Sequence, residues 1–167
     1  ISLCHTTQRN PNDRFGFIIA SNNTWTRFLI ATMTTHLLPK LTASFTDLKT
    51  SISADAGIVT DLDLHIEKEQ LIIPYQTHSV NALVIDKEFL QQNAEKRNEQ
   101  LQNIDALITQ EKGVCLCVST ADCTPILLYD RKQQVIAAIH AGWRGSVNYI
   151  VRKTLEQMNR LYNTQGE

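Results

Sequence analysis

Residues 125–139 read PILLYDRKQQVIAAI, two apolar runs joined by a short polar turn. This pattern predicts two neighbouring strands of a hairpin. Just upstream, residues 114–118 read VCLCV, an apolar run that is typical of a buried strand. The centre of the chain is therefore expected to be a set of consecutive β-strands.

Shorter apolar runs precede this segment, and a helical pattern follows it. Further strands are predicted at residues 17–20, 28–30, 71–73, 80–85 and 106–108. Residues 87–103 are polar, which indicates a solvated helix or an exposed connection. After Gly145 the apolar residues recur at helical spacing as far as Tyr162, with Ser146 as the candidate N-cap and Asn163 at the end. This order of elements predicts a mixed sheet with helices against it.

Length, composition and charge are those of a globular protein. The chain has 167 residues, 43% of them hydrophobic and 20% charged, which excludes a disordered tail, a collagen-like fibre and a low-complexity linker. Its net charge of −1 supplies no general attraction to nucleic acid or anionic lipid. No apolar run approaches the ~18 residues of a membrane span, and no signal peptide is visible. We expect one domain over residues 1–167, cytoplasmic, without nucleic-acid or membrane partners.

The four cysteines do not make a disulfide scaffold in a chain of this length. Cys115 and Cys117 are two positions apart in one apolar run, so both face the same side of the predicted strand. Small apolar thiols pack well in a core, and we interpret these two as core residues. Cys123 lies instead in a polar interruption between two apolar runs and is a candidate functional residue.

Three side chains with metal-binding or nucleophilic chemistry lie where a predicted strand gives way to a loop. His78 and Cys123 each lie between two predicted strands, and His140 ends the run at residues 135–139. Such loops commonly carry functional groups on a rigid scaffold. One thiolate and two imidazoles suit zinc and leave a fourth position for water or substrate. Together the three residues favour a metal site.

Two observations limit this interpretation. The spacing of the three residues matches no short metal-binding motif, and each histidine alone is consistent with a hydrogen-bonded loop residue. A closed structural site would also need a fourth protein ligand. His65 is the nearest candidate, but its alternating sequence context predicts an exposed strand position.

The segment after His140 has the features of an anion site. Gly142 and Gly145 permit close backbone approach. Arg144 offers a planar fork for phosphate or carboxylate, and the helix that follows presents free amides at its N-terminus. The sequence therefore indicates a place for an anion beside the candidate metal ligands.

Alternatives stay open for this segment. Arg144 is equally consistent with an ion pair to a structural carboxylate such as Asp122 or Asp105. Trp143 either stacks on a base or packs beneath the loop, and packing is the commoner role.

Four motifs stand in order along the chain. They are QTHS at 76–79, DALIT at 105–109, TADCTPILL at 120–128 and AIHAGWRG at 138–145. With them the chain resembles, over residues 71–162, the laccase-domain family, long labelled polyphenol oxidase or multicopper oxidase and now described as purine nucleoside phosphorylases. The last two motifs are long and highly specific.

The resemblance implies an α/β (α+β) fold of layered mixed β-sheets with flanking helices. It implies zinc, or copper in older descriptions of the family, held by His78, Cys123 and His140. We expect Arg144 and Asp122 to act with them as catalytic residues. The implied reactions are phosphorolysis of adenosine, inosine, guanosine and methylthioadenosine, and deamination of adenosine by water. The implied partners are therefore purine nucleosides and phosphate.

The chain departs from the family pattern in three places. Ser79 replaces the glycine that usually follows the first histidine, which implies a different local backbone. Residues 1–60 lack the family's N-terminal threonine-arginine-glycine-glycine pattern. The glycine- and cysteine-bearing segment that follows the last helix in the family is missing here. The resemblance therefore implies a fragment, or joined segments, of a longer protein.

Three other functions use the same residues and are kept as alternatives. A cysteine hydrolase would use Cys123 as nucleophile and His78 or His140 as base. A non-catalytic domain would hold zinc only to order its loops. A copper-dependent polyphenol oxidase is disfavoured, because multicopper sites need more histidines than the five present.

Overall fold

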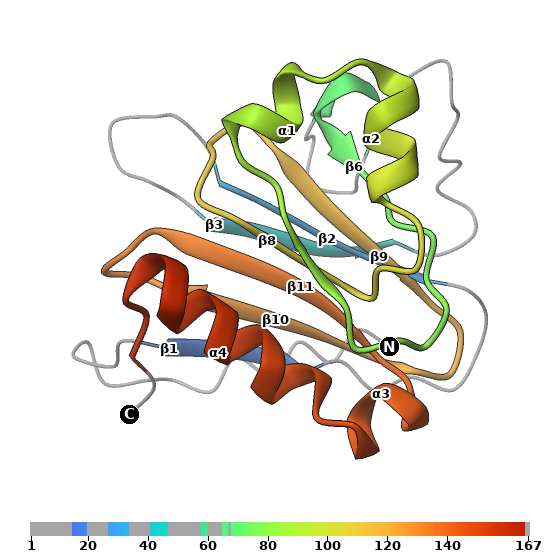
Figure 1. Cartoon of the computed structure of the whole chain (residues 1–167), viewed down its shortest axis with the longest axis vertical. Helices are drawn as coiled ribbons and strands as arrows, with labels where there is room; N and C mark the ends of the chain where they lie inside the picture. The colour runs from blue at the N-terminus through green and yellow to red at the C-terminus, as the bar shows by residue number, and fades with distance from the viewer. Residues whose placement is uncertain are drawn as a thin grey trace.

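The computed structural model describes residues 15–19, 27–33, 41–46, 58–59, 65–66 and 68–165. Within these ranges, one sheet has the strand order β1-β10-β11-β8-β7 and a second has the order β3-β2-β9-β6 (Figure 1). The strands of the first are β1 (Phe15–Ile19), β10 (Thr124–Asp130), β11 (Val135–Ala141), β8 (Ala106–Thr109) and β7 (Ala82–Val84). Those of the second are β3 (Leu41–Thr46), β2 (Arg27–Met33), β9 (Cys115–Thr120) and β6 (Leu71–Ile72). The short strands β4 (Ile58–Val59) and β5 (His65–Ile66) pair with each other.

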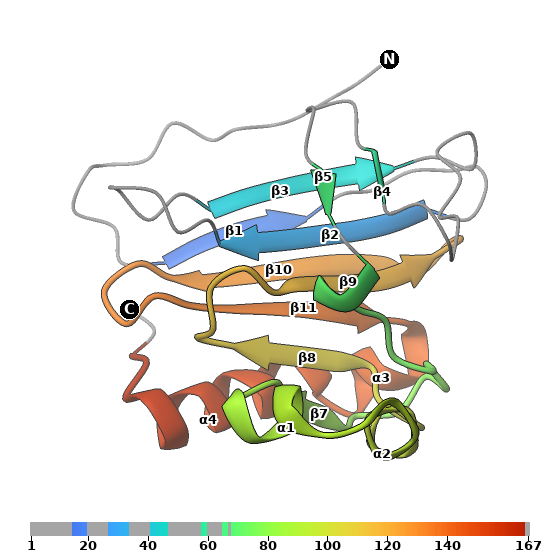
Figure 2. The ribbon, with the colours of Figure 1, turned by 90° about the horizontal axis from the view of Figure 1, so that it is seen from above.

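Helices flank the sheets. They are α1 (Lys87–Gln91), α2 (Ala94–Gln100), α3 (Trp143–Val147) and α4 (Ile150–Tyr162), with a 3-10 turn at Lys68–Gln70 before β6. The four-stranded sheet lies on one side of the five-stranded sheet, and α3 and α4 lie on the other (Figure 1). Seen from above, the long strands of both sheets run in roughly the same direction across the molecule (Figure 2). No helix in the described part of the chain has the length and apolar character that a membrane span needs.

The central strand β11 is buried along its whole length because both of its faces pack against another layer. Ile136 and Ala138 point into the core between the two sheets, with Leu116 of β9. Ala137 and Ile139 point the other way, toward α4. This alternation is the period of two that a strand imposes on its side chains. A strand covered on both faces is a rigid base for a functional group at its end.

The predicted α/β class is confirmed, and so is the hairpin at its centre. β10 and β11 pair antiparallel, with Thr124 opposite Ala141 and Asp130 opposite Val135. The polar stretch 87–103 forms α1 and α2. Their N-caps, Asp86 and Asn93, accept hydrogen bonds from the amides of Phe89 and Lys96.

The prediction of Ser146 as the N-cap of the last helix is wrong. Ser146 lies inside the short helix α3, whose N-cap is Gly142. Tyr149 has a left-handed φ of 65°, which interrupts the ladder of helical hydrogen bonds, and α4 begins only at Ile150. The predicted end of this helix is confirmed, because Asn163 adopts the left-handed C-terminal conformation.

Candidate metal centre

Strand pairing at one end of the five-stranded sheet brings Cys123, His140 and Asp105 together. In the β10–β11 hairpin, Pro125 lies opposite His140, so Cys123, two residues before Pro125, is beside the end of β11. On the other side of β11, Ile139 lies opposite Ala106 of β8. The next residue pair follows the same register, since the amide of His140 donates to the carbonyl oxygen of Asp105 at 2.8 Å.

The pairing of β7 with β8 brings His78 to the same place. These two strands are parallel, with Ala82 next to Ala106. The residues just before β7 therefore lie beside Asp105, which just precedes β8. His78 and Ser79 are in this connection between β6 and β7, and both contact the Asp105 carboxylate.

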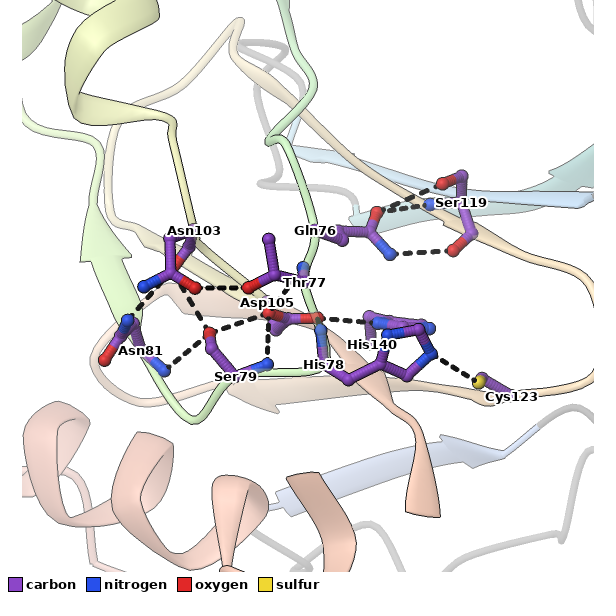
Figure 3. A network of polar contacts seen from close by, with 10 residues as sticks. All are labelled: Gln76, Thr77, His78, Ser79, Asn81, Asn103, Asp105, Ser119, Cys123 and His140. Atoms are coloured by element: carbon purple, nitrogen blue, oxygen red, sulfur yellow. Dashed lines mark hydrogen bonds and ion pairs between the residues drawn. The ribbon is translucent and has the colours of Figure 1, made fainter. Parts of the chain in front are cut away.

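His78, Cys123 and His140 form a group with the geometry of metal ligands. One ligand atom from each lies within 4.8 Å of the others, and Sγ of Cys123 is 3.6 Å from Nε2 of His78 (Figure 3). A tetrahedral zinc with bonds of about 2.3 Å to sulfur and about 2.0–2.1 Å to nitrogen holds two such atoms about 3.6 Å apart. The group therefore fits zinc in both donor chemistry and spacing.

A buried carboxylate orients the ring of His140. Nδ1 of His140 lies 2.7 Å from Oδ1 of Asp105, and both side chains are almost fully buried. With Nδ1 donating to the carboxylate, the lone pair of Nε2 is left for a metal. The rings of His78 and His140 are edge to face, with their centres 4.9 Å apart, so the two imidazoles share one small space.

The Asp105 carboxylate stays ionised although it is buried. Burial by itself raises its pKa, but hydrogen bonds from His140, from the Ser79 hydroxyl and amide and from the Thr77 amide lower the pKa to about 2. A negative charge is therefore present behind the histidines at neutral pH. From the sequence, the only role expected for the Asp105 side chain is an ion pair with Arg144. No local pattern in the sequence marks this role, because it depends on the pairing of β8 with β11 and with β7.

The loop that carries His78 is also built on Asp105. The amides of Thr77, His78 and Ser79 all donate to the carboxylate, at 3.2, 3.0 and 2.7 Å. His78 has a left-handed φ of 62°, which is uncommon for a residue other than glycine. The left-handed residue is thus the histidine itself, and Ser79, which replaces the family's glycine, adds a hydroxyl hydrogen bond to Asp105 at 2.7 Å.

Gln76 joins the same loop to the four-stranded sheet. Its side-chain amide donates to the carbonyl oxygen of Ser119 in β9 and accepts from the Ser119 amide, both at 2.8 Å (Figure 3). The Gln76 side chain thus makes the two hydrogen bonds to the Ser119 backbone that a residue of a neighbouring strand would make. They fix the loop before His78 against the end of β9, four residues before Cys123.

The other predicted site residues, Asp122 and Arg144, are close in the chain to Cys123 and His140 but are outside the ligand group. Asp122 is exposed. Burial raises the pKa of the Cys123 thiol, and the charges of Asp122 and Asp105 raise it further. Arg144 is exposed, with its guanidinium 5.4 Å from the centre of the Trp143 ring. Trp143 is itself 69% exposed, so the prediction that it packs beneath the loop is wrong.

The suggested pairing of Arg144 with Asp105 or Asp122 is not observed. Within residues 69–165 no ion pair joins Arg144 to a carboxylate, and Asp105 is occupied by His140 and by the loop amides. The helix N-terminus beside Arg144 is that of the short helix α3, in which Arg144 itself lies, and not that of the last helix α4.

Cys115 and Cys117 are buried in β9, as predicted for core residues. Burial raises the pKa of Cys115 to about 12. Burial, with the neighbouring Cys115, also raises the pKa of Cys117 well above its ordinary value. Neither thiol belongs to the ligand group. His65 lies in β5, and its side chain is outside the described residues.

Comparison with known proteins relates the chain to a described family. Residues 40–167 match the family described as "Multi-copper polyphenol oxidoreductase laccase". The chain is 56% identical over 99 residues to a purine nucleoside phosphorylase of Bacteroides thetaiotaomicron, a match that covers 59% of this chain and 37% of that protein. It is 38% identical over 106 residues to adenosine deaminase RL5 from an unknown prokaryotic organism, covering 64% of this chain and 40% of the relative.

The fold has a counterpart among solved structures. Hypothetical protein YfiH of Bacillus licheniformis aligns with a TM-score of 0.51 and 23% identity, over 57% of this chain and 36% of that chain. At 23% identity, this similarity shows that the two proteins share a fold and nothing more. In each of these comparisons the chain spans less than half the length of the protein that it matches.

Proposed function

We propose, from the premise that the chain belongs to the multi-copper polyphenol oxidoreductase laccase family, that it forms part of a zinc-dependent purine nucleoside phosphorylase. The observation that carries the metal assignment is the 3.6 Å separation of Cys123 Sγ and His78 Nε2, with His140 turned toward them by Asp105. The names of the relatives, a purine nucleoside phosphorylase and an adenosine deaminase, support purine nucleosides as the substrate class.

The ligand chemistry supports zinc. One thiolate and two imidazoles are a borderline-soft donor set, and the chain has too few histidines for several copper ions. Zinc at His78, Cys123 and His140 would supply a Lewis acid to the reaction.

In phosphorolysis a phosphate oxygen bonds to the anomeric carbon of the ribose while the bond from that carbon to the base breaks. The products are ribose 1-phosphate and the free base, which takes up a proton. Arg144 is the residue proposed to hold the phosphate, because its guanidinium pairs with no carboxylate in residues 69–165 and its planar fork matches a phosphate. Holding the anion beside the positive charge that develops on the sugar stabilises the transition state.

Adenosine deamination is proposed as a second activity of the same site. Water replaces phosphate as the nucleophile, attacks the purine ring, and ammonia leaves. The exposed ring of Trp143 offers a surface on which a purine could stack. Asp122 stays a predicted catalytic residue, and its position next to Cys123 in the chain supports a role at the site.

The state of Cys123 favours a metal ligand over a nucleophile. A cysteine nucleophile needs a lowered pKa, whereas burial and the charges of Asp122 and Asp105 raise the pKa of the Cys123 thiol. A bound metal ion removes the thiol proton by its own charge. The raised pKa disfavours the cysteine-hydrolase alternative, in which His78, with Nε2 3.6 Å from Sγ of Cys123, would be the base.

The test is to incubate metal-analysed protein with adenosine, with and without phosphate, and to separate ribose 1-phosphate, adenine and inosine. We expect about one zinc per chain, adenine only when phosphate is present, and inosine in its absence. Stoichiometric copper in place of zinc would contradict the metal assignment. Zinc without turnover would indicate a binding domain, and turnover that survives chelation but not thiol alkylation would indicate a cysteine hydrolase.

A further inference from the structure

We propose that Asp105 is a positioning residue that sets two of the three metal ligands at once, His140 through its ring and His78 through its backbone. The inference rests on the proposed zinc site. It concerns a residue that binds no metal itself, and it goes beyond the ordinary case in which one carboxylate orients one histidine.

The contact with His140 selects which ring nitrogen is available. Oδ1 of Asp105 lies 2.7 Å from Nδ1 of His140, and the exposed fractions of the two side chains are 0% and 5%. A buried carboxylate accepts but does not donate, so the ring proton is held on Nδ1. Nε2 then carries the lone pair that a metal requires.

The contacts with the His78 loop act on the backbone. Three successive amides, those of Thr77, His78 and Ser79, point at the two oxygens of Asp105. Donors converge in this way only when the chain turns sharply, and the left-handed φ of 62° at His78 provides that turn. Figure 3 shows the carboxylate between the loop and His140, with the two rings beyond it. Asn103 also holds the loop by accepting from the hydroxyls of Thr77 and Ser79, but the three backbone amides are all directed at Asp105.

Asparagine has the same shape as aspartate, but its side-chain amide cannot accept all of these hydrogen bonds. Oδ1 of Asp105 receives donors from His140 and His78, and Oδ2 receives the Thr77 and Ser79 amides and the Ser79 hydroxyl. In Asp105→Asn one of these positions becomes an NH₂ group. If the NH₂ group faces the loop, it lies opposite the backbone amides, which are also donors, and the hydrogen bonds are lost. Facing His140, it moves the ring proton to Nε2 and blocks the ligand atom.

The experiment compares Asp105→Asn with Asp130→Asn. Asp130 is also fully buried, and its Oδ1 accepts the amides of Lys132 and Gln133 at the far end of β10. Zinc dissociation constants are measured by chelator competition. We expect Asp105→Asn to weaken binding about 100-fold, the upper end for loss of a ligand's hydrogen-bond partner, and Asp130→Asn to change it less than about threefold. Equal effects of the two variants would overturn the proposal.

A second comparison separates the two contacts. In the His140→Ala protein, residual zinc binding depends on His78 and Cys123, and adding Asp105→Asn is expected to weaken it about another tenfold. No further loss would show that Asp105 acts through His140 alone, which contradicts the coupling of two ligands.

A third test uses the metal-free wild-type chain, so its result does not depend on whether a variant folds. Imidazole ¹⁵N chemical shifts should show a proton on Nδ1 of His140, and a neutral ring with its proton on Nε2 would overturn the proposal. These results are distinct from the proposed activity. Asp105-dependent zinc binding without nucleoside turnover would remove the activity and leave this inference. Phosphorolysis by the wild type, together with unchanged zinc affinity in Asp105→Asn, would support the activity and contradict this inference.

Discussion

Gly142 lies so close to His78 that a Cβ atom on the glycine would be 2.5 Å from Cδ2 of the histidine ring and 3.1 Å from Sγ of Cys123. The backbone of Gly142, with a φ of −70° and a ψ of 166°, is one that any residue adopts. Space beside the ligands, and not backbone conformation, therefore requires glycine at this position.

Replacing Gly142 by alanine should disturb the metal site without unfolding the protein. The added methyl group must push the ring of His78 or the thiol of Cys123 out of place, because real Cβ contacts are never this short. We expect zinc affinity to fall at least about tenfold, as for displaced ligand partners, while the melting temperature changes little. Chelator competition and thermal denaturation measure the two effects.

Gly113→Ala is the matched control for this variant. Gly113 has a left-handed φ of 75°, and a Cβ there would meet only Nε2 of Gln70, at an ordinary contact distance of 3.9 Å. Alanine there should therefore cost about 1 kcal/mol of stability through backbone strain and leave zinc affinity unchanged. A Gly142→Ala protein that binds zinc as tightly as the wild type would show that the ligand group is placed differently.

The metal ligands could be selected from sequence because each lies where a predicted strand gives way to a loop. The ends of the continuous apolar runs mark where the strands stop, and the hairpin from Pro125 to His140 has a register that follows from its short polar turn. Cys123 and His140 were therefore predictable as neighbours from local pattern alone. His78 was predicted to lie with them because its imidazole can bind a metal and because it lies between two predicted strands.

The role of Asp105 could not be read in the same way. It depends on the parallel pairing of β7 with β8, which is a long-range relationship that no local pattern reports. The start of the last helix was missed for a different reason. Its apolar spacing continues through Val147, but the left-handed Tyr149 separates α3 from α4, and tyrosine carries no sequence signal for that conformation.

The cysteines should divide into one metal ligand and two core residues. Cys123→Ala should reduce bound zinc from about one per chain to almost none, because two imidazoles alone bind it far more weakly. Cys115→Ala and Cys117→Ala should each keep the zinc and lose about 1 kcal/mol of stability, the usual cost of removing one heavy atom from a packed core. Elemental analysis and urea denaturation test these outcomes, and loss of zinc in either core variant would contradict the ligand assignment.

The buried thiols should also make stability fall at alkaline pH. The pKa of Cys115 is about 12 in the folded protein against an ordinary value of 9.0, so the unfolded chain loses this proton first. The stabilisation is complete below pH 9 and is lost as pH rises from 9 toward 12. Each such thiol contributes a slope of about 1.4 kcal/mol per pH unit in that window.

Urea denaturation at several pH values between 8 and 10.5 measures this slope. The Cys115→Ala/Cys117→Ala double variant is the comparison, because it retains every other group that titrates in this range. Its free energy of unfolding should decline less steeply above pH 9 than that of the wild type. Parallel curves would mean that the two thiols are not held neutral by burial.

Arg144 should affect phosphorolysis more than deamination, because only phosphorolysis uses an anion as its nucleophile. Arg144→Lys keeps the charge but loses the two-pronged geometry, so the KM for phosphate should rise while zinc content stays intact. Arg144→Ala should cost more, about 2–4 kcal/mol in transition-state stabilisation, by analogy with removal of a donor to a developing charge. The side chain is exposed and pairs with no carboxylate in residues 69–165, so both variants should melt at nearly the wild-type temperature. Phosphorolysis and deamination must be measured on the same preparations. Equal loss of both activities at normal stability would mean that Arg144 serves the nucleoside or the loop, and its assignment to phosphate would then be wrong.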